Sequence, residues 1–288
     1  MDEASAHTIG DLLKRQEPAL TLITGDSNKV LRHLPGEFFQ TCVTSPPYWS
    51  LRDYNIPGQI GLEASLDEYI RNLCRVFEQV YRALRPDGTL WLNIGDAYTS
   101  GGRTWRAPDR KNPIRGMDIR PPTPEGLKPK DLIGIPWRLA FELQRAGWHL
   151  RADVVWNKPN CQPESVKDRP TRSHEYVFLL SKNEDYLYHS EAHRGPNGRN
   201  LRTVWEIHTQ AFRDAHFATF PTALVEPCIT LCSRRGDYIL DPFAGSGTTG
   251  LVSAGLGRSF IGVELNPDYV KIAEKRLRGV LLRGQLEL

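Results

Sequence analysis

The residues best suited by type and spacing to take part in a reaction form one short loop, TSPPYW, at residues 44–49. They are Ser45, Pro46, Pro47 and Tyr48, followed by Trp49. The serine hydroxyl and the first proline carbonyl can accept hydrogen bonds, while the two prolines stiffen the loop and lack an N–H that could donate a competing bond. The two aromatic rings can stack on a flat ligand. The loop is therefore either a structural turn with buried rings or a rigid loop that binds a planar ligand.

A second informative group of residues lies in DYILDPFAGSGTTG, residues 237–250. Gly245 and Gly247 follow a strand-like run and precede a helical one, so the backbone can approach a ligand and the helix N-terminus offers unpaired N–H groups. Glu264 ends the next apolar run, seventeen residues after Gly247, near the position where nucleotide-binding domains place an acid on ribose hydroxyls. With Asp241, this pattern favours a nucleoside cofactor over a tight turn without a ligand. The chain lacks the P-loop motif G-x-x-x-x-G-K-[S/T], which argues against an ATP-binding site of the P-loop type.

The two motifs together resemble those of a known family. DPFAGSGTT is similar to the S-adenosylmethionine loop of DNA amino-methyltransferases, and TSPPYW resembles their catalytic (D/N/S)-PP-(Y/F) loop. The catalytic loop precedes the cofactor loop, as in the permuted β group. The lesser matches between and around them are Gly25-Asp26, WNKPN, HEYVFLLSK and HFATFPTALVEPC, so the resemblance covers most of the chain.

The resemblance implies S-adenosyl-L-methionine as the cofactor and assigns residues to it. Asp241 would face the methionyl amino group, Glu264 would hold the ribose hydroxyls, and Asp26 would lie near the adenine. The other residues assigned to the cofactor are Phe220, Pro221, Phe243, Ala244, Gly245, Ser246, Gly247, Thr248 and Asn266. For Phe220, simple core packing is an equal alternative.

The resemblance also implies a reaction for the Ser-Pro-Pro-Tyr loop. The amine on cytosine N4 or adenine N6 is a poor nucleophile, and hydrogen bonds to the Ser45 Oγ and the Pro46 carbonyl would favour a localised lone pair. Tyr48 would stack on a base flipped out of the duplex. The amine would then attack the sulfonium methyl in line, with positioning supplying most of the rate. In the family, S-P-P-(Y/F) is mostly associated with N4-cytosine, so the N4-cytosine type is favoured over N6-adenine.

DNA contacts are predicted from charge. Residues 103–130 hold eight Lys and Arg against three Asp and Glu, and this basic insertion suits phosphates or guanine edges. The candidate DNA-contacting residues are Trp49, Arg103, Arg106, Arg110, Lys111, Arg115, Arg120 and Lys158. A solvated loop is the alternative for the insertion, a strand end for Lys158 and core packing for Trp49. A second candidate recognition segment, 184–216, is where much of the β group recognises its target, although it carries four Lys and Arg against five Asp and Glu.

Composition narrows the class of protein. The chain has 288 residues, 40% of them hydrophobic and 25% charged, as expected for one large α/β domain or two smaller ones. The N-terminus is acidic where a signal peptide would be basic, and no apolar run is long enough to span a bilayer. Five cysteines without C-x-x-C spacing predict reduced thiols in a cytoplasmic protein. The resemblance to DNA amino-methyltransferases implies a prokaryotic cell or a phage as the source. The eight histidines show no metal spacing, so no metal is expected.

The pattern of predicted elements indicates an α/β fold. Strands are expected over 19–26, 88–98, 148–158, 174–182, 237–243 and 260–265, with another leading into Ser45. Helices are expected over 27–34, 65–84, 135–147, 220–233, after the glycine-rich turn and over 267–277. Ser65 would cap the second helix, and Pro86-Asp87-Gly88 would end it. Alternating elements favour a mostly parallel sheet with helices on both faces, the Rossmann-like methyltransferase fold.

The expected organisation is one domain spanning 1–288. Residues 1–98 and 131–183 would form a catalytic half and 217–288 a cofactor-binding half, with 99–130 as a basic insertion. The leading function is N4-cytosine methylation of double-stranded DNA by base flipping, within a restriction–modification system with a separate cognate endonuclease; a homodimer is compatible with this function. The alternatives are N6-adenine methylation and a non-catalytic regulator that binds cofactor and DNA.

Two residue pairs allow further interpretations. Pro227-Cys228 could be a nucleophile of C5-cytosine methylation, but its place in an apolar helix before the cofactor loop favours a buried thiol. His174-Glu175 could be an acid–base pair, although a structural or substrate-orienting role is favoured. Trp156 and Lys158 could line the base pocket.

Overall fold

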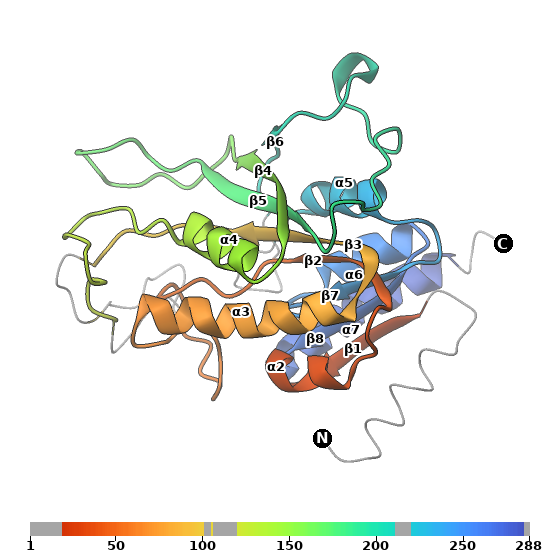
Figure 1. Cartoon of the computed structure of the whole chain (residues 1–288), viewed down its shortest axis with the longest axis horizontal. Coiled ribbons are helices and arrows are strands. Elements are labelled where there is room, and N and C mark those ends of the chain that lie inside the picture. The colour runs from red at the N-terminus through yellow and green to blue at the C-terminus, as the bar shows by residue number, and fades with distance from the viewer. Residues whose placement is uncertain (1–18, 101–104, 106–119, 211–219, 285–288) are drawn as a thin grey trace.

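The computed structural model describes residues 19–100, 105, 120–210 and 220–284. These residues build one eight-stranded sheet in the order β1-β8-β7-β2-β3-β5-β4-β6 (Figure 1). The strands are β1 (Leu20–Thr24), β2 (Phe39–Thr44), β3 (Leu84–Ile94), β4 (His149–Asn157), β5 (His174–Ser181), β6 (Val204–Glu206), β7 (Tyr238–Asp241) and β8 (Ser259–Glu264). Although β1 comes first in the chain, it pairs with β8, so it joins the strands of the cofactor-binding half.

The sheet is parallel except at β5, which runs antiparallel to both β3 and β4. The expectation of a mostly parallel, Rossmann-like sheet is confirmed. The reversal has a consequence for function. The first residues of β5 lie at the same edge of the sheet as the carboxyl ends of the parallel strands, where ligands bind in open α/β folds.

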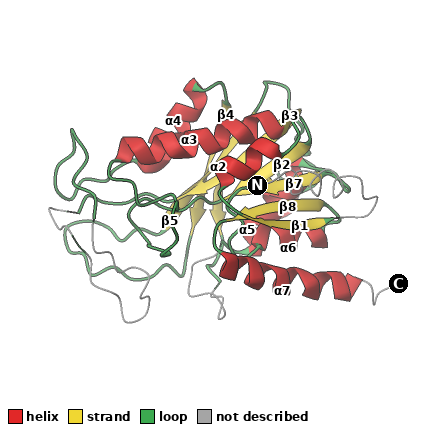
Figure 2. Cartoon of the chain, turned by 90° about the horizontal axis from the view of Figure 1, so that it is seen from below, coloured by secondary structure: helices red, strands yellow, loops and turns green. Residues whose placement is uncertain are grey.

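Helices cover both faces of the sheet (Figure 2). The helices are α2 (Ser27–Val30), followed by the 3-10 turn η1 (Leu31–His33), α3 (Leu66–Ala83), α4 (Ile135–Arg145), α5 (Thr222–Cys232), α6 (Thr248–Gly255) and α7 (Pro267–Gly284). α2, α3 and α4 lie on one face, and their apolar residues form one core with β2 and β3. α5, α6 and α7 lie on the other, where α5 packs on β2 and β3 and α6 on β7 and β8, and apolar residues of β4 and β5 complete a second core.

The sequence predicts α3 well at its start and less well at its end. The Ser65 Oγ accepts a hydrogen bond from the Glu68 N–H at 3.2 Å, as the N-cap prediction requires. The helix ends at Ala83, within one residue of the prediction, but Pro86-Asp87-Gly88 do not form a turn after it, because β3 already begins at Leu84 and not at the predicted residue 88. The three residues lie in an irregularity of the β2–β3 pairing between Phe39 and Thr41. A proline and glycine inside a strand mark such a bulge as readily as a turn.

Segment 184–216 contains a strand that its sequence does not predict. β6 is only three residues long, and it pairs in parallel with β4. Its central residue, Trp205, is buried and lies 5.9 Å from Trp91 between ring centroids. Three residues are too few to show a period-two pattern. β6 anchors the described part of this segment to the sheet.

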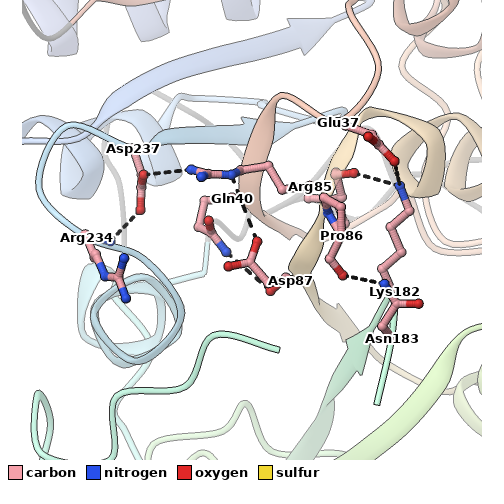
Figure 3. A network of polar contacts seen from close by, with 10 residues as sticks. Glu37, Gln40, Arg85, Pro86, Asp87, Lys182, Asn183, Arg234 and Asp237 are labelled. Carbon is pink, nitrogen blue, oxygen red and sulfur yellow. Dashed lines mark hydrogen bonds and ion pairs between the residues drawn. The ribbon is translucent and has the colours of Figure 1, made fainter. Parts of the chain in front are cut away.

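A polar network joins the elements at the amino ends of the parallel strands (Figure 3). Arg85 pairs with Asp237 at 3.3 Å, which links β3 to the turn before β7. Lys182 donates to the Leu84 carbonyl at 2.9 Å and faces Glu37 at 3.5 Å, while the Asn183 side chain donates to the Pro86 carbonyl at 2.7 Å. The network therefore holds the irregular start of β3 against its neighbours, at the edge opposite the ligand-binding edge.

Two predictions from composition can be compared with the structure. All five cysteines, each in the described part of the chain, are unpaired, and Cys228 is buried in α5 with its Sγ 3.2 Å from the Leu224 carbonyl oxygen. Burial raises the pKa of the Cys228 thiol well above its usual range, which removes the nucleophile interpretation. Among the described helices, none combines the length and apolar character needed to cross a bilayer.

Candidate active site

A cavity of about 760 Å³ opens at the carboxyl edge of the parallel strands and brings the two motifs together. Most of the predicted site residues line it: Asp26, Ser45, Pro46, Pro47, Tyr48, Lys158, Phe220, Phe243, Ala244, Gly245, Ser246, Thr248, Glu264 and Asn266. Pro221 is buried at the N-cap position of α5 instead. The cavity is thus shared by the catalytic loop after β2 and the glycine-rich loop after β7, as the sequence predicts for a methyl donor beside its acceptor.

The Ser-Pro-Pro-Tyr loop is fixed from behind. The Tyr69 hydroxyl of α3 donates to the Pro47 carbonyl at 2.8 Å, and the backbone N–H of Ser50 donates to the Gly61 carbonyl at 2.8 Å. The Pro47 carbonyl therefore serves as an anchor. The half-buried Ser45 remains at the cavity wall with Pro46. A loop held this way presents its acceptors with little rearrangement.

Tyr48 is half-buried, and its ring is held by neighbours from two other strands. Its hydroxyl donates to Glu175 Oε2 at 2.7 Å. The ring passes so close to Gly95 that a Cβ there would lie 2.7 Å from Tyr48 Cε2. Burial and the adjacent Glu175 carboxylate raise the pKa of Tyr48 well above its usual range, so the hydroxyl stays protonated and acts as a donor.

Glu175, the second residue of β5, is the hub of a polar cluster at this end of the cavity. Its Oε2 also accepts from the Asn93 side chain at 3.2 Å, and its Oε1 forms an ion pair with Lys158 Nζ. Lys158 lies 4.2 Å from the centre of the Trp156 ring, so it also makes a cation–π contact. Burial, Arg172 and Lys158 lower the pKa of the adjacent His174, which favours a neutral imidazole. Glu175 is thus bound to Tyr48, consistent with an orienting role.

The glycine-rich loop is shaped by left-handed backbone and by α7. Gly247 has φ 77°, and a Cβ there would lie 2.9 Å from the Ala273 Cβ, so only glycine fits between loop and helix. Gly245 also has positive φ, 51°, but the space around its missing Cβ is open. From α7, Arg276 donates to the Ser246 carbonyl and hydroxyl, both at 2.6 Å, and to the Thr248 hydroxyl at 3.2 Å. The loop is thereby clamped around the cavity wall.

Glu264 and Asp26 lie side by side because β1 and β8 are paired. Glu264 accepts the Gly245 N–H on Oε2 and the Asn266 N–H on Oε1, both at 2.8 Å. Burial raises its pKa above the usual range, and these N–H bonds oppose the shift. Asp26 accepts from the Asn28 N–H at 2.9 Å as the N-cap of α2. Each carboxylate has acceptor capacity left for ligand hydroxyl or amino groups.

Asp241 is not where the resemblance implies. Its side chain is 1% exposed and does not line the cavity. One oxygen accepts from the Thr44 hydroxyl at 2.7 Å and the Phe243 N–H at 3.0 Å, and the other from the Thr249 hydroxyl at 2.7 Å. Burial raises the pKa of Asp241 to about 6. The carboxylate is turned inward to join β2, β7 and α6, so its assignment to the methionyl amino group is corrected to a structural role.

Trp49 is also corrected, from a DNA contact to core packing. The ring is 4% exposed, and its Nε1 donates to the Glu63 carbonyl at 3.1 Å. It packs against Tyr69 with ring centroids 6.5 Å apart. The TSPPYW loop therefore combines both interpretations of its rings, since Trp49 is buried and Tyr48 faces the cavity.

The candidate DNA residues are only partly described. Arg103, Arg106, Arg110, Lys111 and Arg115 lie outside the described residues, and their assignment stays a prediction. Arg120 is half-buried, and Trp105 is 62% exposed. From the second segment, Thr209 and Gln210 line the cavity, and the Asn160 side chain holds Thr209 by two bonds of 2.8 and 3.1 Å. Segment 184–216 therefore reaches the cavity, which charge alone does not predict.

Several lining residues are absent from the sequence prediction. Asn93 lines the cavity and contacts Glu175, and Tyr54 meets Tyr269 edge to face at 5.9 Å on the cofactor side. Arg276 does not line the cavity, but it contacts the predicted residue Ser246 from α7. Arg52 and Arg172 line the cavity, and each has a buried side-chain nitrogen without a hydrogen-bond partner in the described structure. Nothing in their local sequence marks them, because strand order and loop packing bring them here. Guanidinium nitrogens of this kind suit the anions that a cofactor and DNA carry.

Comparison with known proteins identifies the family. The sequence model of the DNA methylase family, N6_N4_Mtase, matches residues 39–275. The chain belongs to this family. The type II methyltransferase M.Cfr9I from Citrobacter freundii is 58% identical over 275 residues, covering 93% of this chain and 92% of the relative. M.SmaI from Serratia marcescens is 56% identical over 262 residues, 89% of this chain and 90% of the relative.

Two solved structures share the fold. The PvuII DNA methyltransferase (cytosine-N4-specific) superposes with a TM-score of 0.69 at 22% identity, covering 90% of this chain and 88% of that one. The Thermus thermophilus protein TTHA0409, complexed with S-adenosyl-L-methionine, gives a TM-score of 0.62 at 26% identity over 91% of this chain and 96% of that one. The chain is a DNA methyltransferase that uses S-adenosyl-L-methionine as methyl donor.

The cavity of this DNA methylase fits that cofactor. Gly245 leaves open space at the wall, Glu264 keeps acceptor capacity for ribose hydroxyls, and Phe243 and Phe220 offer apolar surface. Within the described residues, no group of three or more His, Cys, Asp or Glu is arranged to hold a metal ion.

Proposed function

We propose that this DNA methylase transfers the methyl group of S-adenosyl-L-methionine to the exocyclic N4 amine of cytosine in double-stranded DNA. The observation that carries the proposal is the placement of Ser45 and Tyr48 in the same cavity as the glycine-rich loop and Glu264. A flat base on Tyr48 would have its amine next to the acceptors of the Ser-Pro-Pro loop.

The chain's own residues account for activation by positioning. The Ser45 hydroxyl and the Pro46 carbonyl accept hydrogen bonds from the target amine, which keeps its lone pair from delocalising into the ring. The cofactor supplies an electrophilic methyl group on sulfur. Because Tyr69 and Gly61 hold the loop rigid, the amine can be aligned without reorganising the protein, and alignment of this kind supplies much of the rate in such transfers.

Serine at position 45 supports cytosine as the target. In the amino-methyltransferase family, loops that begin with serine are mostly associated with N4-cytosine and loops that begin with aspartate with N6-adenine. Both bases present a similar amidine edge, so the same machinery acting on adenine N6 is the alternative outcome. A regulator without catalysis has no need of the complete Ser-Pro-Pro-Tyr loop, which argues against that class.

A role in a type II restriction–modification system is part of the proposal. M.Cfr9I and M.SmaI, which this chain matches over about nine-tenths of its length, are named type II methyltransferases. Such a role implies a separate endonuclease that recognises the same DNA sequence. It also implies that segments 99–130 and 184–216 recognise that sequence. The restriction–modification role, the endonuclease and the recognition segments are all part of the proposal.

The direct test is nucleoside mass spectrometry. The protein is expressed in cells that lack other DNA methylation, and the digested DNA is compared with DNA from cells expressing the Ser45→Ala variant. N4-methyl-2′-deoxycytidine that disappears in the variant supports the proposal. N6-methyl-2′-deoxyadenosine would overturn the base assignment, and no methylated nucleoside from folded protein that binds DNA would favour the regulator.

A further inference from the structure

The Tyr48 ring is held in position by a polar cluster that the methyl-transfer chemistry does not itself require. Its hydroxyl donates to Glu175 Oε2 at 2.7 Å, and Gly95 leaves just enough room for the ring edge. Tyr48, Asn93, Lys158 and Glu175 come from four segments of the chain and all line the cavity. A platform that must receive a flipped base benefits from having its orientation set before the base arrives.

The Glu175 carboxylate divides its two oxygens between two tasks. Oε2 accepts from the Tyr48 hydroxyl and the Asn93 amide, whereas Oε1 is occupied by Lys158. Both charged side chains are largely shielded, with 16% of Lys158 and 18% of Glu175 exposed. An ion pair this buried is sensitive to loss of either member, because the remaining charge is left without a partner. Lys158 therefore fixes the carboxylate that in turn fixes the ring.

The antiparallel direction of β5 makes this arrangement possible. Glu175 of β5 is paired with Trp156 of β4, and Lys158 follows Trp156 by two residues. On the other side of β5, Asn93 of β3 is paired with Val177 of β5. Since β5 starts where β3 and β4 end, Asn93 and Lys158 can both reach Glu175, which in turn binds Tyr48 of the loop that follows β2. The cluster is a product of sheet topology, and its members line the ligand cavity, although the Tyr48 ring also packs against the apolar core.

We propose that Glu175 is a positioning residue of the methyl transfer: it locks the Tyr48 ring as a preformed platform for the target base, with Lys158 and Asn93 holding its carboxylate. The inference rests on the proposed function in that Tyr48 stacks on the base. It does not depend on whether that base is cytosine or adenine.

A double-mutant cycle tests the inference. Glu175→Gln, Tyr48→Phe and the double variant are compared with wild type in single-turnover methyl transfer to unmodified genomic DNA. One amide oxygen cannot replace the two carboxylate oxygens, so Glu175→Gln loosens the ring, and Tyr48→Phe removes the hydroxyl that Glu175 binds. Each single variant is expected to lower the rate about 10-fold, as loss of a charge-assisted hydrogen bond implies. The double variant should be no more than about threefold slower than the slower single variant.

Binding measurements separate positioning from a general structural role. Glu78→Gln, an exposed change on α3, is the matched control and should leave the rate unchanged. The cofactor Kd, measured by calorimetry, should stay within about twofold in every variant, because the bonds of the cluster run among its own members and none of them holds the glycine-rich loop. The inference would be overturned if the two rate losses multiplied in the double variant, or if the slower variants also bound the cofactor more weakly.

A crystal structure of Glu175→Ala without DNA provides a readout independent of activity. The Tyr48 ring should then occupy more than one orientation or lose order. A ring that keeps its wild-type position in this variant would contradict the positioning role. Nucleoside analysis of the wild-type product is scored separately, so an adenine product or no product would refute the proposed function without deciding the role of Glu175.

Discussion

At the scale of single residues, membership of a motif does not decide whether a side chain lines the cavity. Asp241 and Tyr48 each belong to a motif, yet only Tyr48 lines the cavity. The sequence alone indicates that both matter, because both belong to motifs that resemble those of DNA amino-methyltransferases. The sequence does not indicate which way each side chain points. The Asp241 side chain is oriented by hydrogen bonds from Thr44 of β2 and Thr249 of α6. Which way a side chain points is decided by partners distant in the sequence.

The buried Asp241 carboxylate makes stability dependent on pH. Burial raises the pKa of Asp241 to about 6 in the folded protein, above the ordinary aspartate value near 3.9. The folded state therefore binds a proton more tightly than the unfolded state. This group's contribution is fully present below the unfolded pKa and is lost as the pH rises through about 6.

The Asp241→Asn variant isolates this contribution. Between pH 4 and pH 7, the wild type should lose up to about 3 kcal/mol of stability relative to the variant, at about 1.4 kcal/mol per pKa unit. Urea unfolding of both proteins across this range gives the difference directly. Parallel curves for the two proteins would show that the three hydrogen bonds to the carboxylate compensate its burial.

At the scale of elements, the glycine-rich loop shows how a strand, a loop and a helix are fitted to one another. Gly245 and Gly247 both have positive φ, but only Gly247 touches α7. Gly247→Ala should destabilise the protein without ligand by roughly 2–4 kcal/mol, through left-handed strain and the contact with Ala273. Gly245→Ala should cost about 1 kcal/mol in stability but raise the cofactor Kd about 10-fold, because its methyl group enters space at the cavity wall. Thermal unfolding and calorimetry on both variants check this division, which fails if the two behave alike.

The contact between α7 and the loop gives a second prediction. Arg276→Met removes the donors to Ser246 and Thr248, so the loop should become less ordered and the cofactor Kd should rise about 10-fold. Stability should fall by about 1–2 kcal/mol. Arg278→Met is the control, since Arg278 lies two residues on and is 76% exposed beside Glu274. Equal effects of the two substitutions on calorimetric Kd would argue against a specific clamp.

Elements were largely predictable, and their pairing was not. The regular helices and long strands follow from periodicity and from the Ser65 cap. The bulge at Pro86-Asp87-Gly88 and the three-residue β6 were missed, because neither has enough residues to show a pattern. The antiparallel direction of β5 was also hidden, although it brings Glu175 to Tyr48. The two motif loops were therefore predictable, whereas the residues that hold them in place were not.

At the scale of the whole molecule, the two edges of the sheet have different tasks. The carboxyl edge of the parallel strands carries the cavity, with its buried charges and, among the described residues, guanidinium nitrogens that lack a protein partner. The amino edge carries the polar network of Arg85, Asp237 and Lys182, which joins strands and turns. The first edge leaves groups such as these guanidinium nitrogens for ligands beside the paired cluster around Glu175, while the charged groups of the network at the second edge are paired with one another. Substitutions at the amino edge should therefore affect folding and leave methyl transfer intact.

Lys182→Met tests this separation. The Lys182 side chain is 12% exposed, donates to the Leu84 carbonyl at 2.9 Å and lies 5.3 Å from the centre of the Tyr81 ring. Its loss leaves that carbonyl without this donor at the irregular start of β3, so the free energy of unfolding should fall by about 1–2 kcal/mol. The single-turnover rate should stay within about twofold of wild type, and the exposed Lys275→Met change should alter neither quantity. A slower transfer at unchanged stability would mean that the start of β3 is coupled through the strand to Asn93 and the cluster around Tyr48, and the two edges would then have to be treated as one unit.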